Sequence, residues 1–150
     1  GSEMCIRDSI EALKNAGLAV CAHVGFTPQS VDNLSGFKVQ GRDDNADQLW
    51  ADTNEVVEAG ADMVVFEMVP ADLAGEITAN CPVPTIGIGA GPDTDAQVLV
   101  WHDMADFPAG SHRARFVRQF GAVGEALGAA AADYKRAVHE GEFPADEHTF

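Results

Sequence analysis

The sequence is short of basic residues, of cysteines and of long hydrophobic runs. Only nine lysines and arginines stand against 24 aspartates and glutamates in 150 residues, which gives a formal net charge of −15. A chain this acidic is repelled by phosphate backbones and anionic lipids, which argues against nucleic-acid and membrane-surface binding. Three cysteines do not make a disulfide framework, and a reducing cytoplasm is the expected compartment.

Two further absences concern targeting. No apolar run approaches the roughly 20 residues that a bilayer-spanning helix needs. No basic segment followed by an apolar one opens the chain, so no export signal is expected. The hydrophobic content of 46% is enough for the core of one compact domain. The expected partners are therefore small molecules or other protein chains.

Helical and strand-like patterns alternate along the chain. Apolar residues at helical spacing predict one helix that ends at Gly17, a second over residues 46–60 and a third that opens at Pro70. Short apolar runs predict strands at 18–22, 63–66, 84–88 and, as a weaker fourth, 98–101. These runs do not alternate with polar residues, which is typical of strands buried on both faces.

This alternation predicts an α/β fold of parallel βαβ units, either a doubly wound sheet or a (β/α)8 barrel. A complete barrel needs about 250 residues, so this chain has room for about four units, half a barrel, plus a tail. An apolar stripe that includes Phe116 and Phe120 predicts one long tail helix over about 112–140. Residues 1–9 fit no unit. We expect them to be a cloning scar or a sequence-assembly artefact, and the domain to span 10–150.

Two side chains at predicted strand ends are candidates for chemistry. Glu67 follows the apolar run 63–66, and a buried carboxylate with a raised pKa makes a good general base. The alternative is a structural ion pair. His23 closes the first strand in the same way, and it is either a site residue or a satisfied core histidine.

Three other features carry weaker signals. The glycines of Gly87–Gly91 suit a tight turn slightly better than a phosphate site, because the full dinucleotide fingerprint is missing. His102 beside Asp103 is a weak metal signal, and a structural role is favoured. In the long segment 27–43, Lys38 and Arg42 could attract an anionic substrate, or the segment is an ordinary solvated loop.

Five ordered motifs resemble the ketopantoate hydroxymethyltransferase (3-methyl-2-oxobutanoate hydroxymethyltransferase) family. They are His23-Val24-Gly25-Phe26-Thr27-Pro28-Gln29-Ser30, Gly36-Phe37-Lys38-Val39-Gln40-Gly41-Arg42, Phe66-Glu67-Met68-Val69-Pro70, Ile86-Gly87-Ile88-Gly89-Ala90-Gly91 and Gln97-Val98-Leu99-Val100-Trp101-His102-Asp103. The ending Phe143-Pro144 to Glu147-His148 also resembles the family's C-terminus. The similarity runs from about Ile10 to Phe150.

The resemblance implies a (β/α)8 barrel that moves a hydroxymethyl group from 5,10-methylenetetrahydrofolate to 3-methyl-2-oxobutanoate, giving ketopantoate for pantothenate synthesis. A Mg²⁺ ion that chelates the oxo acid would acidify its C3 proton and stabilise the enolate. By resemblance, Glu67 matches the family's proton acceptor, and His23 matches a histidine in the substrate pocket. Full-length members form ring-like homo-oligomers.

The chain departs from the family in one respect. The family's metal-ligating carboxylates lie in the N-terminal half of the barrel, so no metal ligand is assigned here, and the chain is expected to be an inactive C-terminal fragment. Two alternatives stay open. One is a related barrel enzyme on 2-oxo acids, such as a phosphoenolpyruvate mutase or an isocitrate-lyase-like lyase. The other is a non-catalytic chain that assembles with a complete subunit.

Overall fold

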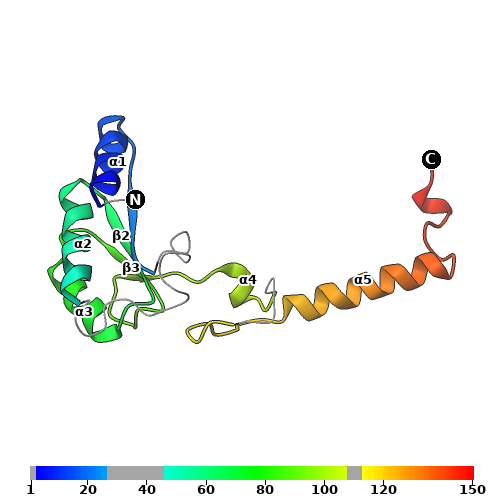
Figure 1. Ribbon diagram of the computed structural model, residues 1–150. Coiled ribbons are helices and arrows are strands. Elements are labelled where there is room, and N and C mark those ends of the chain that lie inside the picture. Colours follow the sequence, from blue (N-terminus) through cyan, green and yellow to red (C-terminus); the bar gives the residue numbers. More distant parts are fainter. Residues whose placement is uncertain (1–2, 27–45, 108–112) are drawn as a thin grey trace. The chain divides into compact units, whose positions relative to one another are not determined.

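The computed structural model of the protein describes residues 3–26, 46–107 and 113–150 (Figure 1). The chain forms two compact units, Gly1–Val98 and Leu99–Phe150. The first unit contains both candidate site residues and the four strands found among the described residues. Each unit is described separately below.

The first unit is a parallel sheet with helices. Its elements in chain order are α1 (Glu3–Asn15), β1 (Cys21–Gly25), α2 (Ala46–Glu58), β2 (Met63–Glu67), α3 (Ala71–Asn80), β3 (Thr85–Ile88) and β4 (Ala96–Gln97). The strands lie in the order β1-β2-β3-β4, and each neighbouring pair is parallel. The predicted α/β class with parallel strands is confirmed.

The helix predicted to end at Gly17 begins at Glu3, so most of the segment 1–9 is helical. Arg7 of this segment contacts Glu11 within α1 at 2.9 Å and Glu58 of α2 at 3.6 Å. Residues 3–9 are thus a continuous part of α1. The predicted domain boundary after residue 9 stays a prediction.

Strand β1 begins three residues later than predicted, at Cys21 instead of Leu18. The cause lies in Asp62, whose carboxylate accepts the Val20 amide at 2.7 Å and the Lys14 ammonium at 2.8 Å. The Val20 amide thus bonds to a side chain instead of to a strand neighbour, although the Val20 carbonyl still accepts the Asp62 amide at 2.8 Å. The Lys14 hydrogen bond is the main reason that the pKa of Asp62 lies below its ordinary value.

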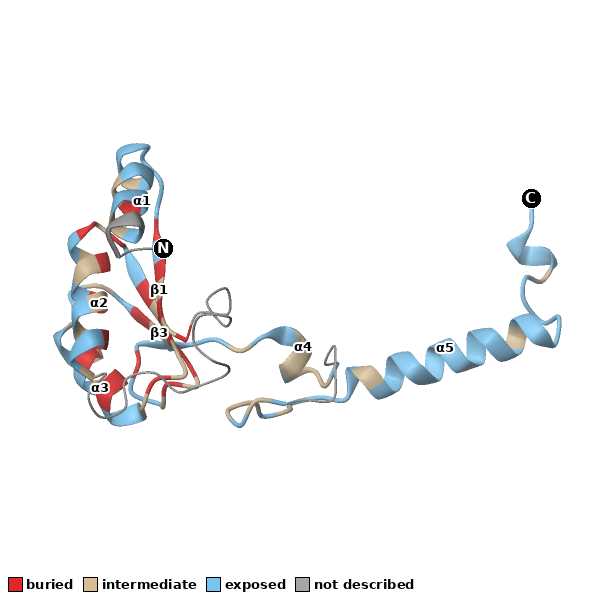
Figure 2. Ribbon diagram, viewed as in Figure 1, coloured by how far each residue is buried: buried red, intermediate tan, exposed pale blue. Residues whose placement is uncertain are grey.

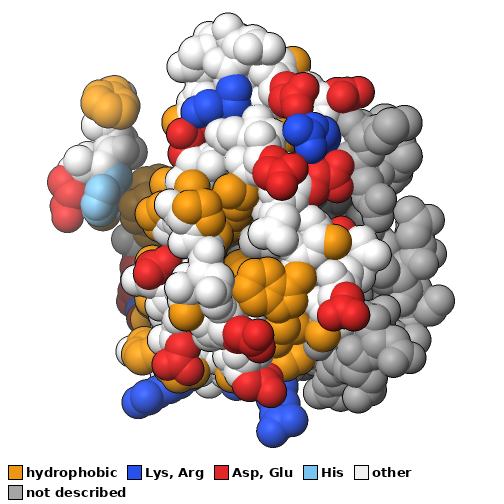
Figure 3. Space-filling view, turned by 90° about the vertical axis from the view of Figure 1, so that its left-hand side faces the viewer, with side chains coloured by type: hydrophobic (Ala, Val, Ile, Leu, Met, Phe, Trp, Pro, Cys, Tyr) orange, Lys and Arg blue, Asp and Glu red, His pale blue; other side chains and the backbone are white. Residues whose placement is uncertain are grey.

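The core lies on one face of this sheet. Alternate strand residues Ala22, Val24, Val64 and Phe66 are buried there, at 0–7% exposure. They pack against apolar side chains of α2 and α3, namely Leu49, Val56, Leu73, Ala74 and Ile77 (Figure 2). On the outer surface of the helices, hydrophobic patches lie among charged side chains, and acidic groups outnumber basic ones (Figure 3). Helix α2 alone has four carboxylates and no base.

The opposite face of the sheet is more open, and here the prediction of strands buried on both faces is wrong. Cys21 and Met63, which are partners in the ladder, are both exposed, and Val65 is only half-buried. The three helices α1, α2 and α3 all lie on the other side of the strands (Figure 1). A continuous apolar run is typical of a strand that is covered on both faces. In the described part of the first unit, helices cover only one of the two faces.

We expect the 150-residue chain to self-associate through this open face, because exposed apolar sheet surface and a free strand edge favour pairing. Met63→Lys places a charge on the face at a position that is 36% exposed. In sedimentation velocity it should shift the chain toward monomer, whereas Glu76→Lys on the exposed side of α3 should not. A sharp monomeric peak with cooperative melting for the unsubstituted chain would contradict this expectation.

The predicted fourth strand at 98–101 is wrong in position. The strand β4 is only Ala96–Gln97, and the ladder ends where the Val98 amide donates to Gly87 O at 3.0 Å. Trp101–Met104 then form the short helix α4. The apolar run predicted a buried strand, but its side chains stay largely exposed. Val98, Val100 and Trp101 are 47–55% exposed.

The tail helix is shorter than predicted. Helix α5 spans Val123–His139, and Asp146–His148 form a 3₁₀ turn after it. Phe116 and Phe120, which were predicted on the helix, precede it. Gly121 and Gly124 at its start have low helical propensity, and no side chain caps the helix at Ala122, so it does not extend further back. Among the described residues, no helix has the length and hydropathy of a membrane span.

Candidate functional site

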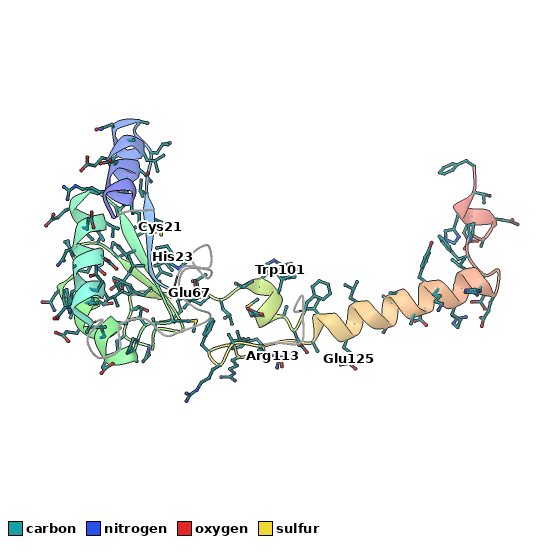
Figure 4. The ribbon with its side chains drawn as sticks, viewed as in Figure 1. Cys21, His23, Glu67, Trp101, Arg113 and Glu125 are labelled. Carbon is teal, nitrogen blue, oxygen red and sulfur yellow. The ribbon has the colours of Figure 1, made fainter. Side chains whose placement is uncertain are left out.

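Glu67 and His23 lie together on the open face of the sheet. Glu67 is the last residue of β2, as predicted. His23 had been predicted to end the first strand, but it is the third of the five residues of β1. His23 pairs with Val65 in the ladder, so Glu67, two residues further along, projects from the same face. The Glu67 Oε2 atom lies 3.0 Å from His23 Nε2 (Figure 4). The structure thus brings both predicted site residues into contact.

The Glu67 carboxyl is largely shielded from water, with 15% of its side chain exposed. This burial raises the pKa of Glu67 above its ordinary value, because the charged form loses hydration. The nearby His23, mainly through its charge, lowers the pKa of Glu67 and so opposes part of that effect. A carboxylate with a raised pKa is a stronger base, as proton abstraction from carbon requires.

The partner atom, His23 Nε2, is buried and carries an unused hydrogen-bonding capacity. Its distance to Glu67 Oε2 suits an ion pair, but no hydrogen bond of regular geometry reaches it from the described residues. A buried polar atom without a hydrogen bond costs about 1–3 kcal/mol of folding free energy. Such an atom beside a base is suited to binding a polar group of a ligand.

A left-handed residue follows Glu67 directly. Met68 has a φ of 53°, a conformation that non-glycine residues adopt rarely and at a cost. This turn ends β2 at Glu67 and sends the chain into Val69, which is 2% exposed, and Pro70 before α3. Met68 was not predicted as part of the site, because nothing in its residue type signals a positive φ.

A cavity of about 150 Å³ opens beside the edge of β1. It is lined by His23 and Gly25 of β1, by Asp52 and Glu55 of α2 and by Ile6 of α1. Asp52 and Glu55 were not predicted as site residues, since acidic residues on a helix usually face solvent. His23 therefore borders both Glu67 and a hollow that can hold a small polar group.

The glycines after β3 form a tight turn, which the sequence favoured slightly over a phosphate site. Gly89 and Gly91 have φ values of 64° and 80°. Gln97 Nε2 donates to Gly91 O at 2.9 Å, and Gly91 packs so closely on Ala71 that a side chain would not fit. Gly91 therefore serves close packing against the start of α3.

The remaining sequence candidates belong to other parts of the chain. His102 and Asp103 lie in α4 of the second unit, where the His102 ring lies 3.8 Å, centre to centre, from Trp101. The segment 27–43, with Lys38 and Arg42, lies outside the described residues.

Divalent metal binding also needs a cluster of ligands. Across residues 3–26, 46–107 and 113–150, no group of three His, Cys, Asp or Glu side chains is placed to hold an ion. The pair of Glu67 and His23 alone does not fit Mg²⁺, which prefers about six oxygen ligands including water.

Comparison with known proteins places these residues in a family. The family model described as ketopantoate hydroxymethyltransferase matches residues 1–146. The chain belongs to the ketopantoate hydroxymethyltransferase family. A relative from Corynebacterium jeikeium, named 3-methyl-2-oxobutanoate hydroxymethyltransferase, is 65% identical over 145 residues. Relatives of the same name from Corynebacterium diphtheriae and Mycolicibacterium vanbaalenii are 62% and 57% identical over 141 and 145 residues.

These matches cover 94–97% of this chain but 51–52% of each relative. The chain therefore spans about half the length of the ketopantoate hydroxymethyltransferases that it matches. The resemblance drawn from the five motifs is confirmed at the level of the family. The match also includes residues 1–9.

The raised pKa of Glu67 makes the stability of the first unit depend on pH. A raised folded-state pKa contributes stability that is fully present below the unfolded-state pKa and lost as pH rises through the folded-state pKa. Glu67→Gln, which cannot ionise, should therefore raise the urea midpoint at pH 8, and this gain should shrink as pH falls below about 4. The exposed control Glu76→Gln should leave the midpoint unchanged at pH 8. An equal gain for Glu67→Gln at both pH values would contradict the argument.

Proposed function

We propose that this chain is the part of a 3-methyl-2-oxobutanoate hydroxymethyltransferase that carries the general base. The complete enzyme moves a hydroxymethyl group from 5,10-methylenetetrahydrofolate to 3-methyl-2-oxobutanoate and forms ketopantoate. One observation carries the proposal: a largely buried carboxylate at the end of a parallel strand, 3.0 Å from a buried imidazole nitrogen, in a chain of this family. Strand carboxyl ends are where parallel α/β folds gather their catalytic groups.

Glu67 is the proposed proton acceptor. Its carboxylate takes the C3 proton of the oxo acid, and the electron pair of the broken C–H bond delocalises into the carbonyl to give an enolate. One C–N bond of the folate's methylene bridge opens to an iminium ion, and the C3 carbon of the enolate forms its new bond to that carbon. Water then replaces the remaining folate nitrogen, which gives the hydroxymethyl group of ketopantoate and releases tetrahydrofolate. Burial favours this step, because it raises the pKa of Glu67 toward the working pH.

His23 is the proposed substrate-binding residue. Its Nε2 atom is buried and lacks a regular hydrogen bond in the described structure, so it has capacity to bind an oxygen of the oxo acid. The short distance to Glu67 places that oxygen close to the base. The two side chains would then hold the substrate and take its proton from one face of the sheet.

The proposal assigns no magnesium ligand to this chain. The described residues do not offer a Mg²⁺ site, so no step above passes through the metal. We propose that its carboxylate ligands lie in the half of the relatives that this chain does not span. There the ion would stabilise the negative charge that develops on the oxo acid.

The remaining expectations follow from the same family. We propose that the four parallel strands are half of a (β/α)8 barrel, whose other half covers the open sheet face. We further propose a cytoplasmic location and a homo-oligomer for the complete enzyme. Its small-molecule partners are then a 2-oxo acid and a reduced folate.

The experiment compares the chain alone with a joined protein. The joined protein fuses this chain to the half of the Corynebacterium jeikeium relative that lies outside the match. We expect folate-dependent ketopantoate formation from the joined protein and none from the chain alone. Activity of the chain alone would overturn the expected inactivity of the fragment.

Products distinguish the alternatives. Carbon–phosphorus bond rearrangement or cleavage of a hydroxy acid by the joined protein, without ketopantoate, would favour a mutase or a lyase. A joined protein that folds but has no activity would favour a non-catalytic assembly chain.

A further inference from the structure

The end of β1 approaches the backbone of Glu67 very closely. Gly25 pairs with Glu67 in the ladder, and the next amide, Phe26 N, donates to Glu67 O at 2.8 Å. A Cβ atom at Gly25 would lie 2.5 Å from that carbonyl oxygen and 2.9 Å from Val69 Cγ2. Real Cβ atoms essentially never approach other atoms so closely. Gly25 also has a φ of +89°, which disfavours any side chain.

The same peptide group is held from its other side. The Met68 amide donates to Ile88 O of β3 at 3.0 Å. The peptide between Glu67 and Met68 is thus bonded through its oxygen to the end of β1 and through its nitrogen to β3. The left-handed Met68 then turns the chain away, so β2 ends with Glu67 as its last side chain.

This fixed backbone determines where the Glu67 carboxylate lies. Within the described residues, the polar side chain that the carboxylate contacts is His23, with 3.0 Å between Oε2 and Nε2. A ladder pushed apart at Gly25 would move the Glu67 backbone away from β1, the strand that carries His23. The 3.0 Å contact between Oε2 and Nε2 would then lengthen.

We propose that Gly25 is a positioning residue for Glu67. By having no side chain, it lets β1 close on the Glu67 carbonyl and sets the carboxylate against His23. The inference rests on the proposed function for what Glu67 does in the reaction. The positioning itself is a property of this chain and is tested without activity.

The first test uses the 150-residue chain with Gly25→Ala and a matched control, Gly17→Ala. Gly17 also has a left-handed backbone, with φ +78°, but a Cβ there meets nothing within 4 Å. Both variants carry the same kind of backbone strain, and only Gly25→Ala adds the collision. Hydrogen exchange by mass spectrometry reports the Phe26 amide, and carbethoxylation by diethylpyrocarbonate reports access to His23.

We expect Gly25→Ala to accelerate exchange at Phe26 about tenfold, the effect of one lost hydrogen bond. Carbethoxylation of His23 should also accelerate, because its Nε2 atom separates from Glu67. Amides in the middle of β2 should keep their protection, and Gly17→Ala should change neither readout. Unchanged rates at Phe26 and His23 in a folded Gly25→Ala chain would overturn the proposal.

A second variant covers loss of folding. If Gly25→Ala unfolds the unit, the double variant with Val69→Ala removes the methyl group at 2.9 Å and leaves only the collision with Glu67 O. It is compared with Val69→Ala alone. Faster exchange at Phe26 and faster modification of His23 in the double variant support the proposal, and equal rates overturn it.

The joined protein adds a kinetic readout. A misplaced base slows the chemical step, so Gly25→Ala should lower kcat about 10²-fold and leave KM nearly unchanged. Gly17→Ala should keep both constants. An inactive unsubstituted joined protein would count against the proposed function and leave the exchange result on Gly25 standing. Equal losses for both glycine variants would show a general structural effect and overturn the positioning role.

Discussion

Glu67→Gln is expected to lower the rate of ketopantoate formation by the joined protein about 10²–10⁴-fold, the usual contribution of a general base. Glutamine keeps the shape of the side chain but cannot accept the C3 proton. Glu67→Asp, which withdraws the carboxylate by one methylene from the 3.0 Å contact with His23, should give an intermediate rate. Steady-state kinetics with the oxo acid and the folate measure both effects.

The control for this prediction is Glu76→Gln on the exposed side of α3. It removes the same charge from a chain whose net charge is −15, so it reports any general electrostatic effect. We expect its rate to match that of the unsubstituted joined protein. A similar loss in Glu67→Gln and Glu76→Gln would show that Glu67 has no special role.

The largest loss of stability is expected from Phe66→Ala. Phe66 is fully buried at the centre of the helix-covered face, next to Glu67 in β2. Removing a buried phenyl ring from such a core costs about 3–5 kcal/mol of unfolding free energy, through lost burial and the cavity left behind. That is a large fraction of the 5–15 kcal/mol that a domain typically has. Urea unfolding followed by circular dichroism measures the change.

Phe120→Ala provides the matched control, because Phe120 is 68% exposed. The same chemical change there should alter the unfolding free energy by no more than about 0.5 kcal/mol. The comparison separates burial from residue type. If the two variants unfolded at the same urea concentration, the assignment of the core to the helix-covered face would be wrong.

The sequence predicted the middle of the first unit well. The run Met63–Phe66 became β2 with one residue added, and the run 84–88 became β3 with one residue fewer. Strand β2 lies between two clear helix signals, Gly60 and Pro70, and β3 follows directly after α3, so local pattern and tertiary packing agree. Glu67 was found because a carboxylate after an apolar run is conspicuous, and its place at the end of β2 follows from the same run.

The errors arose where contacts distant in sequence decide the structure. Strand β1 begins after Val20, whose amide binds the carboxylate of Asp62, 42 residues away. The contact between Glu67 and His23 depends on the register of β1 against β2, which no pattern in either strand specifies. The close approach at Gly25 is likewise a property of two strands together. Local periodicity contains none of this information.

The second unit shows a different limit. Its apolar residues at helical spacing predicted one long helix, but glycines at its start and the lack of a side-chain cap confine α5 to Val123–His139. Leu127 and Tyr134 of α5 remain more than half exposed. A periodic apolar stripe therefore located the helix, and capping and glycine content decided where it begins.

The most direct measurement of the role of Glu67 is proton exchange at C3 of the oxo acid. The joined protein is mixed with 3-methyl-2-oxobutanoate in D₂O without folate, and proton NMR follows the C3 signal. We predict that the signal disappears with the unsubstituted protein and persists with Glu67→Gln. Loss of the signal at the same rate with Glu67→Gln would contradict the assignment of Glu67 as the base.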